Sequence, residues 1–304
     1  MLLILWGSLL AAPTTALACW GARALSMGGA FVAVADDAYA TYWNQAGLAK
    51  LTSSEVALTD VTKWKDLNYD LMGAVSVPLG SRGGVGFACT YNKDYPGDGW
   101  AVVDLYYQVG VGWKVWPLSN DQGPVTFSLG LAGKYLSKCI SAGAGRAEAS
   151  SDLTDVDVSC LLDFGPQVAP RQRMFSLGIL VQDLRESGFW GGNLRYVRNV
   201  RPGLCFRPDD KTILSAEFYD VTEEAFVSPG VRLGFERWFT LGKTHPFVAL
   251  RGGVYHLNQD DMRAYTFGLG CRPTKAGKAE FSYALMYWTD SDVATHMVSV
   301  DYRF

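Results

Sequence analysis

From about residue 55 to its last residue, the chain alternates apolar and polar side chains in runs of about ten. In the clearest run, 101–114, the odd positions hold Ala101, Val103, Leu105, Tyr107, Val109, Val111 and Trp113, and the even ones include Asp104, Gln108, Gly110, Gly112 and Lys114. Successive side chains of a strand point to opposite faces, so this run predicts a strand with one apolar face and one polar or small face.

Turn residues divide this part of the chain into fourteen such runs. They begin near Glu55, Tyr69, Gly84, Ala101, Val125, Leu153, Met174, Val200, Thr212, Val227, Phe247, Ala264, Ala279 and Ala294. Bacterial outer-membrane barrels have an even number of antiparallel strands, with short turns at one rim and longer loops at the other, and the connections here alternate in that way. Residues 53–304 are therefore predicted to form an all-β, 14-stranded antiparallel transmembrane β-barrel.

A soluble β-sandwich or barrel is the alternative, because its strands also alternate. A sandwich core built from these runs would have to bury charges in mid-strand or expose Tyr and Trp to water. The chain is 49% hydrophobic and 13% aromatic, which suits a lipid-facing surface better. No segment after the first twenty residues is apolar over the ~18 residues that a membrane helix needs, so a membrane would be crossed by strands.

Residues 1–18 have the apolar stretch and the small-residue end of a cleavable signal peptide. Export of this kind predicts an outer-membrane location in a diderm bacterium, with outer-membrane lipid as a partner. The mature chain would begin at Cys19, which leaves a lipid anchor open, although Ala16 stands where a lipoprotein signal usually has Leu. A formal net charge of −3 without any Lys/Arg run excludes nucleic acid as an expected partner.

Residues 19–52 do not alternate like the rest. The run GARALSMGGAFVAVADD at 21–37, followed by YWNQAGL at 42–48, resembles the N-terminus of the PorV/PorQ-like branch of the FadL-type outer-membrane proteins, whose pattern reads GARALGMGGAFVAVADD and then WNPAGL. Ser26 and Gln45 depart from that pattern, which has Gly and Pro there. The resemblance implies a fourteen-stranded barrel with the N-terminal segment folded into the lumen.

A barrel of fourteen strands is also expected to need a plug because of the size of its lumen. About eight strands enclose a lumen that side chains fill, whereas sixteen to eighteen leave an aqueous channel. Charges of both signs fall on the predicted lumen face, among them Arg232, Glu236 and Arg251. We expect them to hold four polar residues of the segment 19–52, which are Arg23, Asp36, Asp37 and Asn44. The alternative for each of these four is an ordinary helix cap or a solvated loop position. An Ala-rich stretch, 30–40, predicts a short helix.

Enzymatic motifs are absent from the sequence, which has no HExxH, GxSxG, Walker loop or GxGxxG and only three His. We therefore expect no enzyme, no metal and no cofactor, and the Gly-x-Gly steps on the lumen face are expected only to make room.

Two function classes stay open. Resemblance to FadL-type transporters implies uptake of small hydrophobic compounds, with Phe31, Tyr42 and Trp43 as candidate ligand contacts. Resemblance to PorV implies a docking or shuttle component of a type IX-like secretion system, with secretion proteins as partners.

Overall fold

The computed structural model describes residues 21–63, 69–97, 100–116, 125–142, 146–186, 188–189, 194–195, 197–222, 230–241, 247–257, 263–273, 277–289 and 294–304. The helical segments are α2 (Ala22–Ser26), α3 (Ala40–Trp43) and η1 (Gln45–Lys50). The strands are β1 (Glu55–Lys63), β2 (Tyr69–Leu79), β3 (Gly83–Gly97), β4 (Trp100–Trp116), β5 (Val125–Ala142), β6 (Arg146–Ala169), β7 (Gln172–Gln182), β8 (Gly188–Phe189), β9 (Leu194–Arg195), β10 (Asn199–Phe206), β11 (Thr212–Tyr219), β12 (Gly230–Thr240), β13 (Phe247–Leu257), β14 (Arg263–Arg272), β15 (Ala279–Trp288) and β16 (Ala294–Arg303). The predicted signal peptide, 1–18, lies outside the described residues.

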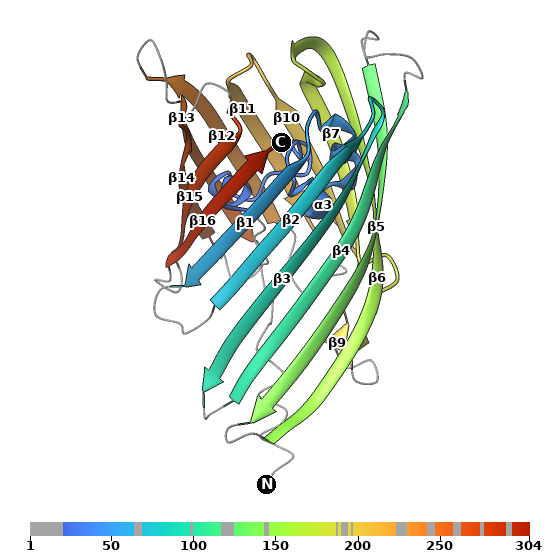
Figure 1. Cartoon of the computed structure of the whole chain (residues 1–304), viewed down its shortest axis with the longest axis vertical. Helices are drawn as coiled ribbons and strands as arrows, with labels where there is room; N and C mark the ends of the chain where they lie inside the picture. The colour runs from blue at the N-terminus through green and yellow to red at the C-terminus, as the bar shows by residue number, and fades with distance from the viewer. Residues whose placement is uncertain are drawn as a thin grey trace.

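Fourteen strands close into one barrel, and each is antiparallel to its two neighbours (Figure 1). The barrel closes where β1 pairs with β16, from Glu55 opposite Arg303 to Lys63 opposite Thr295. Strands β8 and β9 form a separate two-stranded sheet, so β7 pairs directly with β10. The prediction of a 14-stranded antiparallel barrel is confirmed. Among the described residues, no helix is long and apolar enough to cross a membrane.

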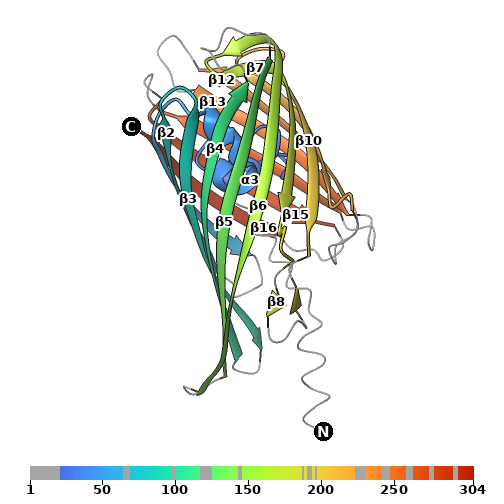
Figure 2. The same ribbon diagram turned by 90° about the vertical axis from the view of Figure 1, so that its right-hand side faces the viewer.

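Every barrel strand but one begins within three residues of its predicted start. The exception is β6, which was predicted from Leu153 and begins at Arg146, because it continues to pair with β5 as far as Arg146 opposite Ala142. The sequence at 140–151 is rich in Ser, Ala and Gly and does not alternate, so it was expected to be a loop. Strands β3 to β6 extend well past the rest of the barrel at one end (Figures 1 and 2). We call that end the far rim.

The opposite end is the short-turn rim, where residues 80–82, 170–171 and 207–211 join consecutive strands and where the chain ends at Phe304. Between the rims the two faces of most strands differ as predicted. Along β12, buried and exposed residues alternate from Gly230 to Trp238. Large apolar side chains are exposed on the outer face of nearly every strand, for example Leu131, Leu177 and Val298. A continuous exposed apolar band of this kind suits lipid.

The N-terminal segment lies inside the barrel, as Figures 1 and 2 show. Its helices differ from the prediction: 30–40 is not a helix, and the helical turns stand at 22–26 and 40–43 instead. The lumen-facing glycines make room for it, as predicted. A Cβ on Gly110 would lie 3.0 Å from the Gln45 side chain, and one on Gly268 would meet Ser26. We call residues 21–51 the plug.

The outer apolar band generates a prediction about lipid. Leu131 lies in the middle of the barrel wall and Leu241 lies just past β12 at the short-turn rim, and the two are equally exposed, at 51% and 55%. In lipid vesicles, Leu131→Arg should lower the free energy of unfolding by about 2–4 kcal/mol and Leu241→Arg by about 0–1 kcal/mol, because a cation costs most at the bilayer midplane. Urea titrations of the reconstituted protein measure both. Equal small costs would mean that water, not lipid, surrounds the band.

Candidate functional site: the plug and the lumen wall

The plug approaches the barrel wall closely because of its glycines. Gly28 has φ +65°, a conformation that favours Gly, and a Cβ there would lie 2.6 Å from the carbonyl oxygen of Leu233. Its N–H donates to Thr266 Oγ1 at 3.0 Å, and the same hydroxyl donates to the carbonyl of Ser26 at 3.0 Å. The Ser at position 26 is accommodated by a hydrogen bond from its hydroxyl to the carbonyl of Arg23 at 2.8 Å.

Arg23 joins the plug to the wall. Its Nε and Nη2 donate to the two carboxylate oxygens of Glu236 on β12 at 2.9 and 3.0 Å. Its Nη1 donates to Asp36 at 2.6 Å and to Asp37 at 3.1 Å, both in the plug. Bidentate pairs of Arg with a carboxylate are among the stronger hydrogen-bonded contacts, and here they are buried. One guanidinium therefore ties two parts of the plug to each other and to the barrel.

The ion pairs continue along the wall from Glu236. Arg251 on β13 donates to Glu236 at 2.7 Å and to Glu280 on β15 at 2.6 Å. Glu280 also accepts from Arg272 at 2.9 Å. Cations and carboxylates thus alternate from the plug across β12 to β15, and each buried charge faces an opposite one. This arrangement meets the requirement that buried charges be paired.

Glu217 on β11 makes a second attachment. Its Oε2 accepts the backbone N–H groups of Phe31 and Val32, both at 3.1 Å. Its other oxygen accepts from Arg201 at 2.8 Å and from Arg232 at 3.2 Å. A single turn forms after this attachment, since the N–H of Ala35 donates to the carbonyl of Phe31 at 3.0 Å. It does not continue as a helix, because Ala35 has φ +23° and the carbonyl of Val32 accepts from the Asn44 side chain instead of from a following N–H.

Asn44 makes the third attachment. Its Oδ1 caps η1 by accepting from the Ala46 N–H at 3.0 Å, and its Nδ2 donates to the carbonyls of Val32 at 2.8 Å and of Cys160 on β6 at 3.2 Å. The Asn44 side chain therefore both caps η1 and links the plug to the wall. Gln45, which replaces the Pro of the family pattern, is fully buried and donates to the carbonyl of Thr41 at 2.9 Å.

Two neighbouring carboxyl groups of the plug differ in pKa. Burial raises the pKa of Asp37 to about 6, and the nearby charge of Asp36 adds to this, although Arg23 acts in the opposite direction. Burial would raise the pKa of Asp36 as well, but Arg23 and Arg207 outweigh it and hold that pKa below the usual value. The carboxyl of Asp37 also interacts electrostatically with three charged residues of the wall, which are Arg303, Glu55 and Asp301.

The three aromatic residues proposed as ligand contacts are not equivalent. Phe31 and Trp43 are 0% and 2% exposed and contact each other edge to face. Cations cover both rings, with Arg23 5.3 Å from the Phe31 ring centre and Arg201 5.0 Å from that of Trp43. They pack the plug against the wall. Tyr42 is only partly buried, and its ring lies edge to face with that of Tyr106 on β4.

Part of the lumen wall was not predicted from the sequence. Strands β13, β15, β16, β1 and β2 turn buried apolar side chains inward, and these are Val61, Met72, Tyr255, Met286, Trp288 and Met297. They belong to one buried apolar cluster, in which Val61 stands opposite Met297 and Ala264 of β14 stands between Tyr255 and Trp288. We call these six residues the apolar strip. Trp288, near the far-rim end of β15, faces the lumen and packs edge to face on Tyr255. Runs such as 285–288, apolar on both faces, were the available signal.

Comparison with known proteins supports the fold. No protein-family profile matches the chain, and no curated protein matches its sequence. The toluene transporter TodX of Pseudomonas putida superposes with a TM-score of 0.61 at 10% identity, over 94% of this chain and 98% of that one. The CymD monoaromatic hydrocarbon channel gives 0.61 at 11% identity, over 93% and 97%, and a Pseudomonas aeruginosa FadL homologue gives 0.58 at 12% identity, over 93% and 97%.

The chain has the fold of the FadL-type channels. At these identities the likeness concerns the fold alone. The narrower resemblance to the PorV/PorQ branch stays a prediction from residues 21–48.

Asp37 generates a prediction about pH. Its pKa is raised on folding, so its contribution to stability is present below pH ~4, the unfolded pKa, and is lost as the pH rises through about 6. The difference in unfolding free energy between wild type and Asp37→Asn should therefore fall from pH 4.5 to 7.5. Asp209→Asn is the control, because hydrogen bonds from Lys211 and Thr212 lower the pKa of this carboxyl at the rim, so its contribution stays constant over this range. A difference that grows with pH for Asp37→Asn would contradict the assignment.

Proposed function

We propose that this chain is a bacterial outer-membrane transport protein that admits small hydrophobic compounds past its plug. Support for the location comes from the lipid-type outer band, from the 1–18 segment of the sequence and from the FadL-type fold. The short-turn rim would face the periplasm and the far rim the outside.

The apolar strip is the observation that carries the proposal. A wall that only had to hold the plug could be polar throughout, yet five strands turn apolar side chains inward, where they share one buried apolar cluster with the plug. Three of these side chains are Met, which is flexible and polarisable and adapts to ligands of different shape. Binding sites for small hydrophobic molecules are lined in this way.

The opposite side of the lumen is polar, and its charges are paired. Lys134 on β5 lies 2.7 Å from Asp157 and 2.5 Å from Asp183. One cation between two carboxylates leaves a formal charge of only −1, which offers little net field to select an ion. A hydrophobic solute with one polar end matches a lumen with one apolar and one polar side. Since the plug packs tightly against the lumen glycines, passage needs the plug to shift.

The docking or shuttle alternative, with secretion proteins as partners, rests on the family pattern alone. No feature of the described residues favours it over transport. It predicts a protein ligand in place of a small hydrophobic one, so the binding experiment below separates the two.

Tyr42 and Trp43 are adjacent residues with different expected roles. In the purified barrel, Tyr42→Ala should weaken binding of toluene or oleate about tenfold with little loss of stability, since it removes one partly exposed aromatic contact. Trp43→Ala should lower the free energy of unfolding by about 3–5 kcal/mol, because its ring is buried. Calorimetric titration and urea unfolding measure the two effects. If neither compound binds the wild-type protein, transport loses its support.

A further inference from the structure

A hollow lies on the outer surface of the barrel near the short-turn rim, where β6, β7, β10 and β11 run side by side. Its volume is about 370 Å³, which is within the range of binding sites for small ligands. Apolar side chains supply nearly all of its surface, and none of the residues that line it is charged. We call this hollow the outer groove.

Three phenylalanine rings form one side of the outer groove. Phe164, Phe175 and Phe206 stand opposite one another on β6, β7 and β10. Their rings stack, with centroids 5.3 Å apart between Phe164 and Phe175 and 5.1 Å apart between Phe175 and Phe206. Stacked rings hold one another in place, so the groove has its shape before a ligand arrives. Because the row extends over three strands, it offers an elongated apolar wall.

A small residue gives the outer groove its depth. Ala216 lies on the outer face of β11, between Leu204 of β10 and Leu233 of β12, which are 51% and 49% exposed. Leu177 and Leu214 complete the lining on either side of Leu204. A single methyl group among such large neighbours leaves a space, and apolar atoms that border an unfilled space lose dispersion contacts. An apolar ligand that fills the space restores those contacts.

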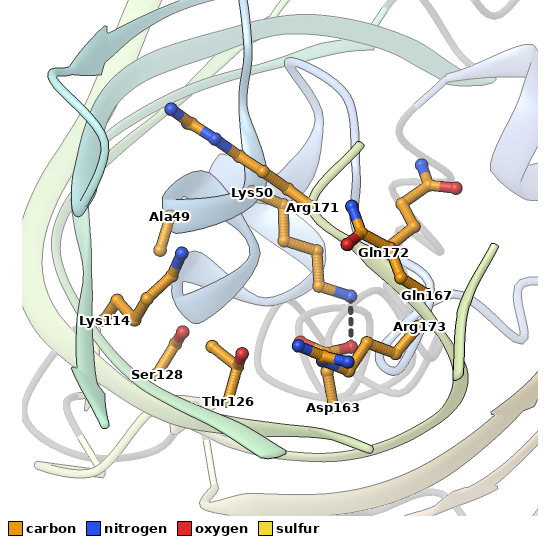
Figure 3. A pocket seen from close by; sticks show the side chains of 10 residues that line it. All are labelled: Ala49, Lys50, Lys114, Thr126, Ser128, Asp163, Gln167, Arg171, Gln172 and Arg173. Atoms are coloured by element: carbon orange, nitrogen blue, oxygen red, sulfur yellow. Dashed lines mark ion pairs between the residues drawn. The ribbon is translucent and has the colours of Figure 1, made fainter. Parts of the chain in front are cut away.

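The wall behind the outer groove is closed. Its floor is the continuous pairing of β10 with both neighbours, in which each residue of Gly203–Phe206 has a partner on β7 and another on β11. On the lumen side, Asp163 stands next to Phe164 in the chain and is held by Lys50 of the plug at 2.9 Å, as Figure 3 shows. The occupant of the groove therefore comes from the surrounding lipid and not from the lumen.

An alkyl chain suits this surface better than a peptide does. Pairing on both sides uses the backbone N–H and C=O groups of 203–206. A bound peptide backbone would lose its hydrogen bonds to water without replacing them, which costs free energy. An alkyl chain has no such groups and can lie along the stacked rings. The groove therefore selects a long apolar chain.

A cation stands at the rim end of the outer groove. Arg237 of β12 lies opposite Thr212, the residue that follows Leu214 toward the rim on the same face of β11, and it donates to the Thr212 hydroxyl at 2.8 Å. Its guanidinium also lies 3.7 Å from Asp209, and these two side chains are nearly half exposed, at 45% and 44%. Exposed ion pairs contribute little free energy, so a phosphate can replace the carboxylate.

We propose that the outer groove binds one phospholipid of the periplasmic leaflet. One acyl chain lies against the phenylalanine rings and over Ala216, and the phosphate faces Arg237. Strands β10 and β11 also carry Arg201 and Glu217, so the bound lipid stabilises the part of the wall to which the plug is attached. The inference rests on the membrane location in the proposed function and not on transport.

The test is native mass spectrometry of the full-length protein in a non-ionic detergent, titrated with dioleoyl-phosphatidylethanolamine. Ala216→Phe fills the groove, and Phe175→Ala removes the middle ring of its wall. Ala279→Phe and Phe267→Ala are matched controls, because these residues lie on the outer faces of β15 and β14 and do not line the groove. Arg237→Gln tests the phosphate contact, with dioleoylglycerol as a ligand that has the same chains and no phosphate.

We expect one phospholipid to bind more tightly than any other. Its affinity should fall about tenfold in Ala216→Phe and in Phe175→Ala and stay unchanged in the two controls. Arg237→Gln should weaken phospholipid binding about threefold and leave dioleoylglycerol binding unchanged. Heat-modifiability on gels confirms that each variant is folded, and insertion of the folded protein into vesicles tests the membrane location separately.

Equal affinity in all variants, or no preferentially bound phospholipid in the wild-type protein, overturns the proposal. Oleate that displaces the phospholipid and no longer binds in Ala216→Phe would make the occupant a free acid and overturn it as well. A dimer that forms without lipid and is lost in Ala216→Phe would make the occupant a second copy of the chain, with the same consequence. A protein that keeps the phospholipid but binds neither toluene nor oleate would lose the transport proposal and retain this site.

Discussion

The structure depends on the pairing of Arg23 with Glu236 inside the barrel. Glu236 and the wall charges beyond it would be buried with poor compensation if Arg23 were absent, and removing one member of such a pair costs about 3–5 kcal/mol. The plug and the wall are therefore not independent parts. Arg23 supplies a counter-charge to the wall, while Glu236 and Glu217 supply the acceptors that the plug needs for its guanidinium and for its backbone.

This dependence follows from the number of strands. Fourteen strands enclose more space than their own side chains fill, so the lumen glycines admit the backbone of the plug where larger residues would exclude it. The same geometry gives the lumen two surroundings beside the ion pairs of the short-turn rim. Toward the far rim one side carries the apolar strip, and the opposite side, at β5 and β6, is polar with Lys134 in contact with Asp157.

Alternation along single strands was enough to predict the barrel, its strand number and nearly all strand starts, because lipid imposes one apolar face on each strand. It put Arg232, Glu236 and Arg251 on the lumen face, whereas Arg23, Asp36 and Asp37 lie in the segment that does not alternate and were chosen from the family resemblance. Pairwise contacts depend on register across strands, which no single run contains. The apolar strip was missed because alternation vanishes where both faces are apolar.

The plug is expected to close the bore of the barrel to ions, and ion conductance in planar bilayers measures whether it does. The intact protein should be nearly closed. A variant that lacks residues 21–48 but keeps the strands should conduct clearly more, because among the described residues the plug alone fills the lumen between the short-turn rim and the middle of the barrel. Equal conductance of the two proteins, with both folded as barrels, would contradict the account.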